Sequence, residues 1–299
     1  MKSIGICLAL CVQSAVFAQT FTEKINKELT FEKKGENTLI VANINGAVKV
    51  TGYEGDKIRV ELTRTIKGKT EERLEKGKRE VQLGIQDLAD TLILFTDGLC
   101  SQFGRAGTKN KGTWNRSQGN WGYQWNNDDR RECHETYDYT FDYVIRVPKA
   151  INIIISTVNN GTVDVQNVLG SVKTNNVNGS IRITGVERET VAHTINGNVD
   201  ITYTKNPVQP CKFYTLNGDI NAWFQKGLAA ELSFESFNGN FFTNVPKLES
   251  MPVEVEKKQT DNGMKYKVNG NRFKVGTGGV RLDFETFNGN VYLKEKTNK

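Results

Sequence analysis

An insertion rich in aromatic and small residues, Gly98–Glu135, carries the side chains best suited to hold a ligand. Three of the four tryptophans lie in it, and between Ser101 and Asn127 it has four cations and no acid. Exposed aromatic rings beside amides and cations suit sugar rings, because the face of a sugar is apolar and its neighbouring hydroxyls form hydrogen bonds. The candidate ligand-binding residues are therefore Trp114, Trp121, Tyr123, Trp125 and Arg116.

Two other interpretations of this insertion stay open, namely a lid that buries its tryptophans over one end of the fold and a partly disordered loop. Cys100 and Cys133 flank the insertion, and an oxidising compartment would allow them to form a disulfide. Cys211 would then remain as a small buried hydrophobe. Nucleic acid also binds aromatic and basic residues, but an exported chain with a formal net charge of only +6 is not expected to bind it.

Paired carboxylates offer a second chemistry. Asp164, Arg182 and Asp200 occupy matching positions of successive sequence repeats. Two carboxylates at the right separation can cleave a glycosidic bond, which would make the chain a polysaccharide-active enzyme. Because the charges alternate in sign, a surface charge ladder is the simpler interpretation.

A polar column of His193, Tyr214 and Glu235 also recurs at matching positions, and we interpret it as outward-facing. His134 and His193 are the only histidines, and they are not at metal-ligand spacing. We expect no catalytic residue, no cofactor and no metal site.

Asn-Gly pairs mark the repeat that must position these side chains. They begin at Asn45, Asn160, Asn178, Asn196, Asn217, Asn238 and Asn288, and the central five follow one another at spacings of 18, 18, 21 and 21. The residues two and four after most glycines are apolar, which indicates a strand with one buried face. A weaker half-step such as Leu169-Gly170 predicts a second strand in each unit.

Stacked units of this kind predict an all-β fold, a β-helix-like parallel β-solenoid of 18–21-residue rungs with an N-terminal β cap. Antiparallel hairpins with Asn-Gly turns are the alternative. The Asn-Gly pairs are expected to provide turns with positive φ. Within a solenoid, we expect a stacked ladder of turns with side-chain hydrogen bonds, formed by Asn45, Asn178, Asn196, Asn217, Asn238 and Asn288.

Other elements flank the rungs. Thr70–Arg79 is charged and predicts a short helix with Thr70 as its N-cap. Tyr137–Val147 alternates apolar and polar residues and predicts a strand that ends at Pro148. Residues 246–272 form a second insertion, in which Val253–Val268 predicts a hairpin.

The N-terminal segment, residues 1–18, has the form of a secretory signal: Lys2, a short apolar run and a small-residue cleavage site ending at Ala18. Residues 19–299 are then expected to form one β-strand-repeat domain with no transmembrane segment. The protein is expected in the periplasm, at the cell surface or outside the cell, with glycans or envelope proteins as partners.

Taken in order, the signal, the first Asn-Gly unit, the charged segment, Val147-Pro148, the rungs and the final Gly276–Gly289 stretch resemble the bacterial putative-adhesin family. The resemblance covers most of residues 19–299 but not the tryptophan-rich insertion. It implies a β-solenoid of the cell envelope or exterior, and it supplies no catalytic residues. The expected function is a non-enzymatic binding module; the alternatives are the polysaccharide-active enzyme and a structural envelope scaffold that binds proteins.

Overall fold

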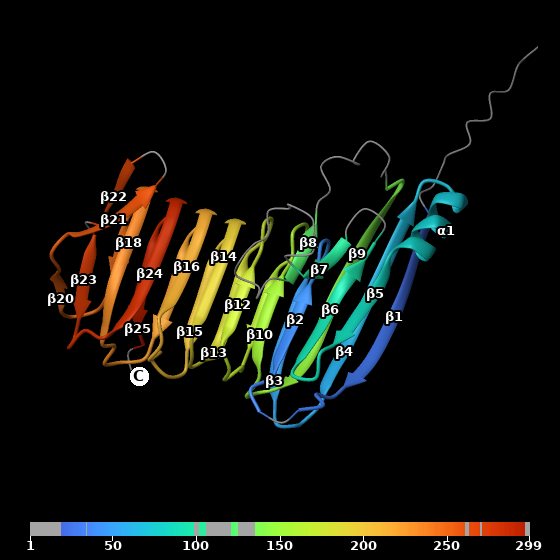
Figure 1. Ribbon diagram of the computed structural model, residues 1–299, viewed down its shortest axis with the longest axis horizontal. Helices are drawn as coiled ribbons and strands as arrows, with labels where there is room; N and C mark the ends of the chain where they lie inside the picture. Colours follow the sequence, from blue (N-terminus) through green and yellow to red (C-terminus); the bar gives the residue numbers. More distant parts are fainter. Residues whose placement is uncertain are drawn as a thin grey trace, which may run out of the picture.

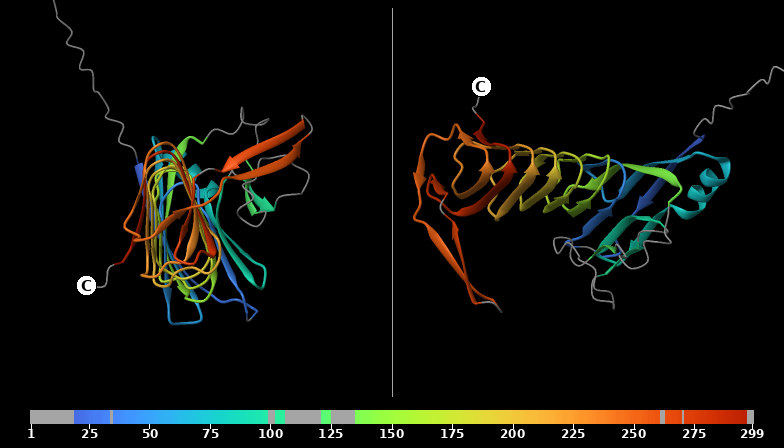
Figure 2. Two further views of the ribbon diagram at one scale, coloured as in Figure 1. Left: turned by 90° about the vertical axis from the view of Figure 1, so that its left-hand side faces the viewer. Right: turned by 90° about the horizontal axis from the view of Figure 1, so that it is seen from above.

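The computed structural model describes residues 19–33, 35–98, 102–105, 121–124, 135–260, 263–269 and 271–296 (Figure 1). Two large sheets dominate the described residues, and one helix, α1 (Glu71–Glu80), accompanies them. Seen end-on in Figure 2, the sheets lie face to face as two layers of a flattened roll. The predicted all-β class is confirmed.

The ten-stranded sheet has the spatial order β1 (Gln19–Leu29), β4 (Ile58–Gly68), β9 (Tyr137–Pro148), β3 (Val48–Tyr53), β11 (Val163–Gln166), β13 (Ile181–Val186), β15 (Val199–Tyr203), β17 (Ile220–Phe224), β25 (Val291–Glu295) and β19 (Phe241–Thr243). The eleven-stranded sheet has the order β20 (Leu248–Ser250), β23 (Arg272–Val275), β18 (Ala230–Asn238), β24 (Val280–Asn288), β16 (Cys211–Asn217), β14 (Thr190–Asn196), β12 (Val172–Asn175), β10 (Asn152–Ser156), β2 (Thr38–Ala42), β6 (Thr91–Asp97) and β5 (Gln82–Asp87). Two separate hairpins pair β7 (Gln102–Arg105) with β8 (Trp121–Gln124), and β21 (Glu254–Thr260) with β22 (Gly263–Asn269).

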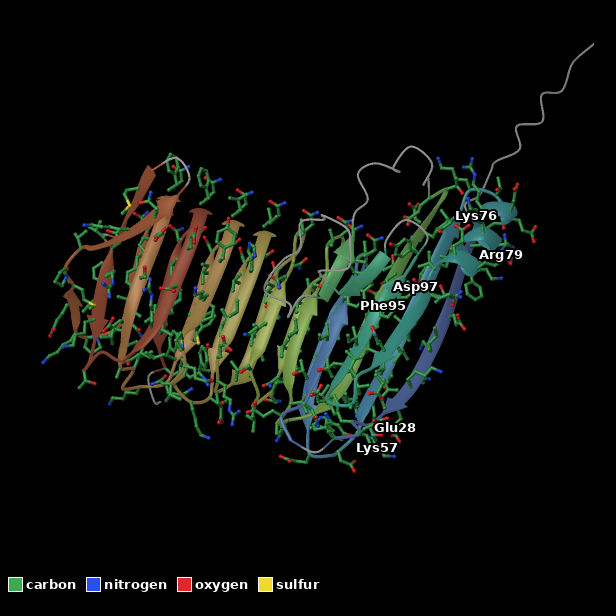
Figure 3. All side chains as sticks on the ribbon, viewed as in Figure 1. Glu28, Lys57, Lys76, Arg79, Phe95 and Asp97 are labelled. Atoms are coloured by element: carbon green, nitrogen blue, oxygen red, sulfur yellow. The ribbon has the colours of Figure 1, made fainter. Side chains whose placement is uncertain are left out.

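The N-terminal end of the roll is antiparallel. β4 pairs with β1 on one side and with β9 on the other, and an ion pair between Lys57 and Glu28 links β4 to β1 (Figure 3). Helix α1 contacts these three strands, and it begins where predicted, because the hydroxyl of Thr70 accepts a hydrogen bond from the backbone N–H of Arg73. This cap covers the core where the parallel rungs begin.

The parallel rungs follow the predicted turn–strand–half-turn–strand pattern. After each central Asn-Gly pair the chain contributes one strand to the ten-stranded sheet and the next to the eleven-stranded sheet. Val163 therefore pairs with Ile181, and Val199 pairs with Ile220, so that each residue meets its equivalent in the next repeat. The spacing of the repeats in the sequence is thus the offset between paired residues of neighbouring strands.

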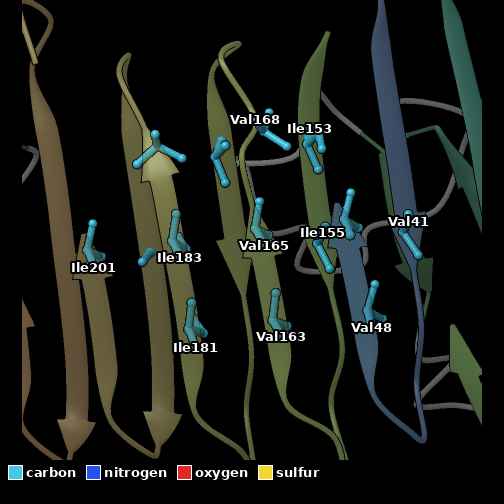
Figure 4. Close-up of a cluster of buried hydrophobic side chains, with 14 of the residues drawn as sticks. Val41, Val48, Ile153, Ile155, Val163, Val165, Val168, Ile181, Ile183 and Ile201 are labelled. Atoms are coloured by element: carbon cyan, nitrogen blue, oxygen red, sulfur yellow. The ribbon is translucent and has the colours of Figure 1, made fainter. Parts of the chain in front are cut away.

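Aliphatic side chains from both sheets fill the space between the layers (Figure 4). Val163, Val165, Ile181 and Ile183 are fully buried, and the residue between each pair faces outward. Alternation with a period of two thus gives every strand one buried face, and stacking joins these faces into one continuous core.

The predicted parallel β-solenoid is matched only in part. Antiparallel strands at both ends make the sheets mixed, and neither sheet closes on itself. The rungs also do not follow sequence order, because β24 lies between β16 and β18, and β25 lies between β17 and β19. Residues 246–272 make this possible, because they lead the chain through β20 and the β21–β22 hairpin to β23, which pairs with the outer edge of β18. The inner edge of β18 is then free to pair with β24 of the final rung. Within residues 246–272, the predicted hairpin forms as β21–β22.

No helix in the described part of the chain combines the length and the apolar character needed to cross a bilayer. The predicted signal, residues 1–18, lies outside the described residues.

Candidate binding surface

Most of the predicted ligand-binding loop lies outside the described residues. The predicted site residues that fall outside the described part are Trp114, Arg116 and Trp125, together with both cysteines of the predicted disulfide, Cys100 and Cys133. The backbone of Trp121 lies in β8, opposite Arg105 of β7. A sugar-binding role for these residues stays a prediction.

Tyr123 is bound to the body of the protein. Its hydroxyl accepts a hydrogen bond from the backbone N–H of Thr96 (2.9 Å) and donates one to the carbonyl oxygen of Ala42 (2.7 Å). Burial holds the pKa of this phenol well above its usual value. Phe103 stacks on Phe95 and meets the Tyr123 ring edge-on. Tyr123 and Phe103 thus fasten the β7–β8 hairpin to β6 and to the end of β2.

The charged column takes its expected place on the ten-stranded sheet. Arg182 pairs with Asp164 on one side and with Asp200 on the other. Asp200 also accepts a hydrogen bond from the amide of Asn221 (2.8 Å), and Asp164 accepts one from Gln166 (3.1 Å). These contacts belong to a polar ladder along the sheet, and the cation between the carboxylates separates them.

The polar column on the eleven-stranded sheet differs from the predicted one by one member. His193 meets Tyr214 edge-on, with ring centroids 4.4 Å apart, but Glu285 stands between Tyr214 and Glu235 because of the inserted rung. Burial lowers the pKa of His193; burial and then Glu285 raise that of Tyr214. Among the described residues, no three His, Cys, Asp or Glu side chains are grouped so as to hold a metal ion.

The predicted asparagine ladder forms, and it is continuous. Each side-chain amide donates a hydrogen bond of 2.9–3.1 Å to the carboxamide oxygen of the asparagine on the preceding rung. In spatial order its members are Asn159, Asn178, Asn196, Asn217, Asn288 and Asn238. Asn159 is a member that the sequence did not predict, and the predicted member Asn45 joins it through a backbone bridge.

An apolar column runs beside this ladder on the outer face of the eleven-stranded sheet. It consists of Val177, Ile195, Leu216, Phe287 and Phe237, each placed directly before a ladder asparagine. Phe287 is 45% exposed and Phe237 is 75% exposed, and their rings stack 4.8 Å apart with an angle of 4°. Sequence reasoning missed this column, although an apolar residue before each of these Asn-Gly pairs was its signal. We call the five residue pairs, from Val177-Asn178 to Phe237-Asn238, the rim.

A second aromatic group lies on the opposite face of the same end of the roll. Phe242 stacks on Tyr292 at 5.1 Å, and the ammonium of Lys294 lies over the rings of Tyr292 (5.5 Å) and Trp223 (5.9 Å). Phe242 is 46% exposed. This group resembles the Phe237–Phe287 pair in its stacked rings, but it lies on the other sheet and includes a cation.

Two hairpins project on the side of the eleven-stranded sheet. Figures 1 and 2 show β21–β22 standing out near one end of the roll and β7–β8 near the other, on the same side. The outward side chains of β14, β16, β24 and β18 lie between them along the roll. The rim is therefore on the face that both hairpins flank.

No protein-family model matches this chain, and no curated protein matches it. Three solved structures are similar. One, described as a putative cell adhesion protein from Clostridium sporogenes, is 12% identical with a TM-score of 0.47, over 92% of this chain and all of that one. A putative adhesin from Bacteroides fragilis is 11% identical with a TM-score of 0.27, over 92% of this chain and 97% of that one. A putative lipid binding protein from Parabacteroides distasonis is 8% identical with a TM-score of 0.23, over the same shares. What this chain binds has to be inferred from its own residues.

Proposed function

We propose that this chain is an exported, non-enzymatic binding module of the cell envelope or surface. The rim carries the proposal. Its apolar side chains are half-buried on the first three rungs and end in two exposed, stacked phenylalanines, on a face whose neighbouring outward columns are mostly polar. A contiguous apolar row of this kind on an otherwise polar surface marks an interaction site.

We also propose that the parallel rungs are a short β-solenoid and that the antiparallel strands are its caps. The spacings of the Asn-Gly pairs recur as the strand registers of both sheets, which supports this interpretation. A stack of rungs offers a long, flat face with regularly spaced side chains, which suits an extended ligand better than a small one.

A catalytic role for Asp164 and Asp200 is not part of the proposal. Arg182 separates the two carboxylates, and both accept hydrogen bonds from neighbouring carboxamides. We therefore expect no release of reducing ends or unsaturated products from polysaccharides, and no difference between the natural protein and Asp200→Asn in that assay.

Co-sedimentation of purified residues 19–299 with isolated cell-envelope fractions tests the proposed function. The rim variant is the double substitution Phe237→Ser and Phe287→Ser, and the matched control is Phe242→Ser, which removes an exposed, stacked ring from the opposite face. We expect the natural protein and the control to sediment with the envelope and the rim variant to stay in solution. Failure of the natural protein to bind, or equal binding by the rim variant, would overturn the proposal.

A further inference from the structure

The rim has a repeat that a ligand can match. Adjacent rungs are about 4.8 Å apart, so the five rungs from Val177-Asn178 to Phe237-Asn238 span about 19 Å. Each rung presents the same pair of groups, one apolar side chain and one carboxamide. The edge of the sheet therefore carries an apolar row and, one residue further along each strand, an amide row.

The amide row keeps hydrogen-bonding capacity for a ligand. Each carboxamide nitrogen has two N–H groups, and the ladder uses one of them. Asn196, Asn217 and Asn288 are exposed residues, so a ligand at the rim can approach their carboxamides. Binding costs little conformational entropy in these side chains, because the ladder hydrogen bonds already hold the carboxamides in place.

Charge limits the class of ligand. Neither row contains an ionisable group, so the rim itself offers no cation to pair with the charges of a polyanion. An uncharged ligand needs no such partner.

The stacked phenylalanines place an aromatic surface at one end of the apolar row. Phe287 and Phe237 lie face to face, and the high exposure of Phe237 shows that much of the outermost ring is open to solvent. An open aromatic ring at the end of an apolar row can stack against the apolar face of a sugar. The amide row beside it can bind the hydroxyls at the edge of that sugar.

We infer that the ligand of the rim is a linear, uncharged polysaccharide that lies along the roll, across successive rungs. The inference rests on the proposed function and deepens it, since it names the ligand class of the same surface. Such a chain combines apolar ring faces with rows of hydroxyls, which is the pattern that the two rows of the rim complement. The affinity must then grow with the number of sugar units until the rim is filled.

Calorimetric titration with defined oligosaccharides tests the inference. The probes are β-1,4-linked glucose and N-acetylglucosamine oligomers from the disaccharide to the octasaccharide, with oligogalacturonates as the anionic comparison. We expect affinity to rise with length and then level off, and the oligogalacturonates to bind more weakly. The double substitution Phe237→Ser and Phe287→Ser should raise the Kd by roughly tenfold or more, and Phe242→Ser should leave it unchanged.

A second variant tests the contribution of the amide row independently of the apolar row. Asn217→Ala interrupts the ladder at its middle rung and leaves both phenylalanines in place. We expect it to weaken the long oligomers more than the short ones. Circular dichroism shows that each variant is folded before it is titrated.

The two proposals fail in different ways. Rim-dependent binding to envelope fractions without binding to any neutral oligomer would overturn the polysaccharide inference and keep the binding module. So would a dimer, detected by sedimentation velocity, that the rim variant abolishes, because the occupant would then be a second copy of the chain. Tighter binding of oligogalacturonates, or affinity that does not depend on length, would also overturn the inference. Absence of binding to both envelopes and oligomers would overturn both.

Discussion

Glycine follows asparagine in the rungs mainly because the backbone of the neighbouring rung occupies the space of a Cβ. A Cβ on Gly161 would lie 1.8 Å from the carbonyl oxygen of Gly46, and one on Gly179 would lie 2.0 Å from that of Gly161. Neither of these two glycines has a positive φ, so the turn conformation expected from the sequence does not explain them. That conformation does occur at four other Asn-Gly glycines of the repeat, with φ of 116–156°: Gly46, Gly197, Gly218 and Gly289. Close approach between rungs is the requirement, and glycine alone meets it.

Gly179→Ala should therefore destabilise the protein although alanine suits the local φ. The added methyl group must push two rungs apart, which costs roughly 1–3 kcal/mol in the free energy of unfolding. Urea denaturation followed by circular dichroism measures the loss. Gly104→Ala is the control, because nothing lies within 4 Å of its Cβ, and it should change the stability by less than about 0.5 kcal/mol. Equal stability of the Gly179 variant and the natural protein would contradict the packing explanation.

Threonine and asparagine side chains reinforce the same contact from inside the roll. The hydroxyls of Thr194 and Thr215 donate to the carbonyl oxygens of Gly179 and Gly197 at 2.8 Å. Asn176 donates to Gly161 in the same way (2.9 Å). These three polar side chains thus each bond to the rung before them, which helps to fix the stacking register.

At the scale of elements, the β21–β22 hairpin differs from every other part of the C-terminal half. Its two strands pair with each other and belong to neither large sheet. Val255 and Met264 are exposed on it. Two strands without a third strand or a packed face have marginal stability in water.

The hairpin should consequently open far more easily than the rungs beside it. Hydrogen exchange measured by mass spectrometry should show rapid exchange in Glu254–Asn269 and strong protection in β16 and β24. Replacement of Glu254–Asn269 by a short glycine–serine linker should leave the melting temperature of the remaining protein almost unchanged. A large fall in melting temperature would mean that the hairpin supports the core.

At the scale of the whole molecule, the last rung is placed inside the stack. β24 and β25 come last in the chain, yet each has a parallel neighbour on both sides. Phe234, Phe241 and Phe273 stack across the end of the core beyond it. The C-terminal cap, formed by β18, β19, β20 and β23, is thus connected to the other rungs through β24 and β25.

Truncation after Val275 should separate the cap from the rungs. It removes β24 and β25, so β16 and β17 each lose one of their two neighbouring strands, and the aromatic and aliphatic side chains packed there become exposed. Because the stability of stacked rungs depends on nearest neighbours, we expect loss of hydrogen-exchange protection from β16 to β23 and retention of protection from β10 to β13. Unchanged protection of β16 and β17 in the truncated chain would contradict this view of the stack.

The sequence by itself determined what depends on local pattern. Alternation with a period of two assigned the buried face of each strand, the spacing of the Asn-Gly pairs set the register of the rungs, and Thr70 marked the start of α1. These features follow from residues that are close together in the chain. Any chain with the same alternation must bury the same faces.

Only the tertiary structure decided which elements become neighbours. Rungs of similar pattern can pair in more than one order, and the detour through residues 246–272 placed the Asn288 rung between those of Asn217 and Asn238. This order brought Phe287 against Phe237 and put Glu285 beside Tyr214. The fold also brings the hydroxyl of Tyr123 into hydrogen-bonding distance of Thr96 and Ala42. Both residues are far from Tyr123 in the sequence, and no local pattern connects them with it. Pairing between distant segments depends on which edges remain open once the others have paired, and that is a property of the whole stack.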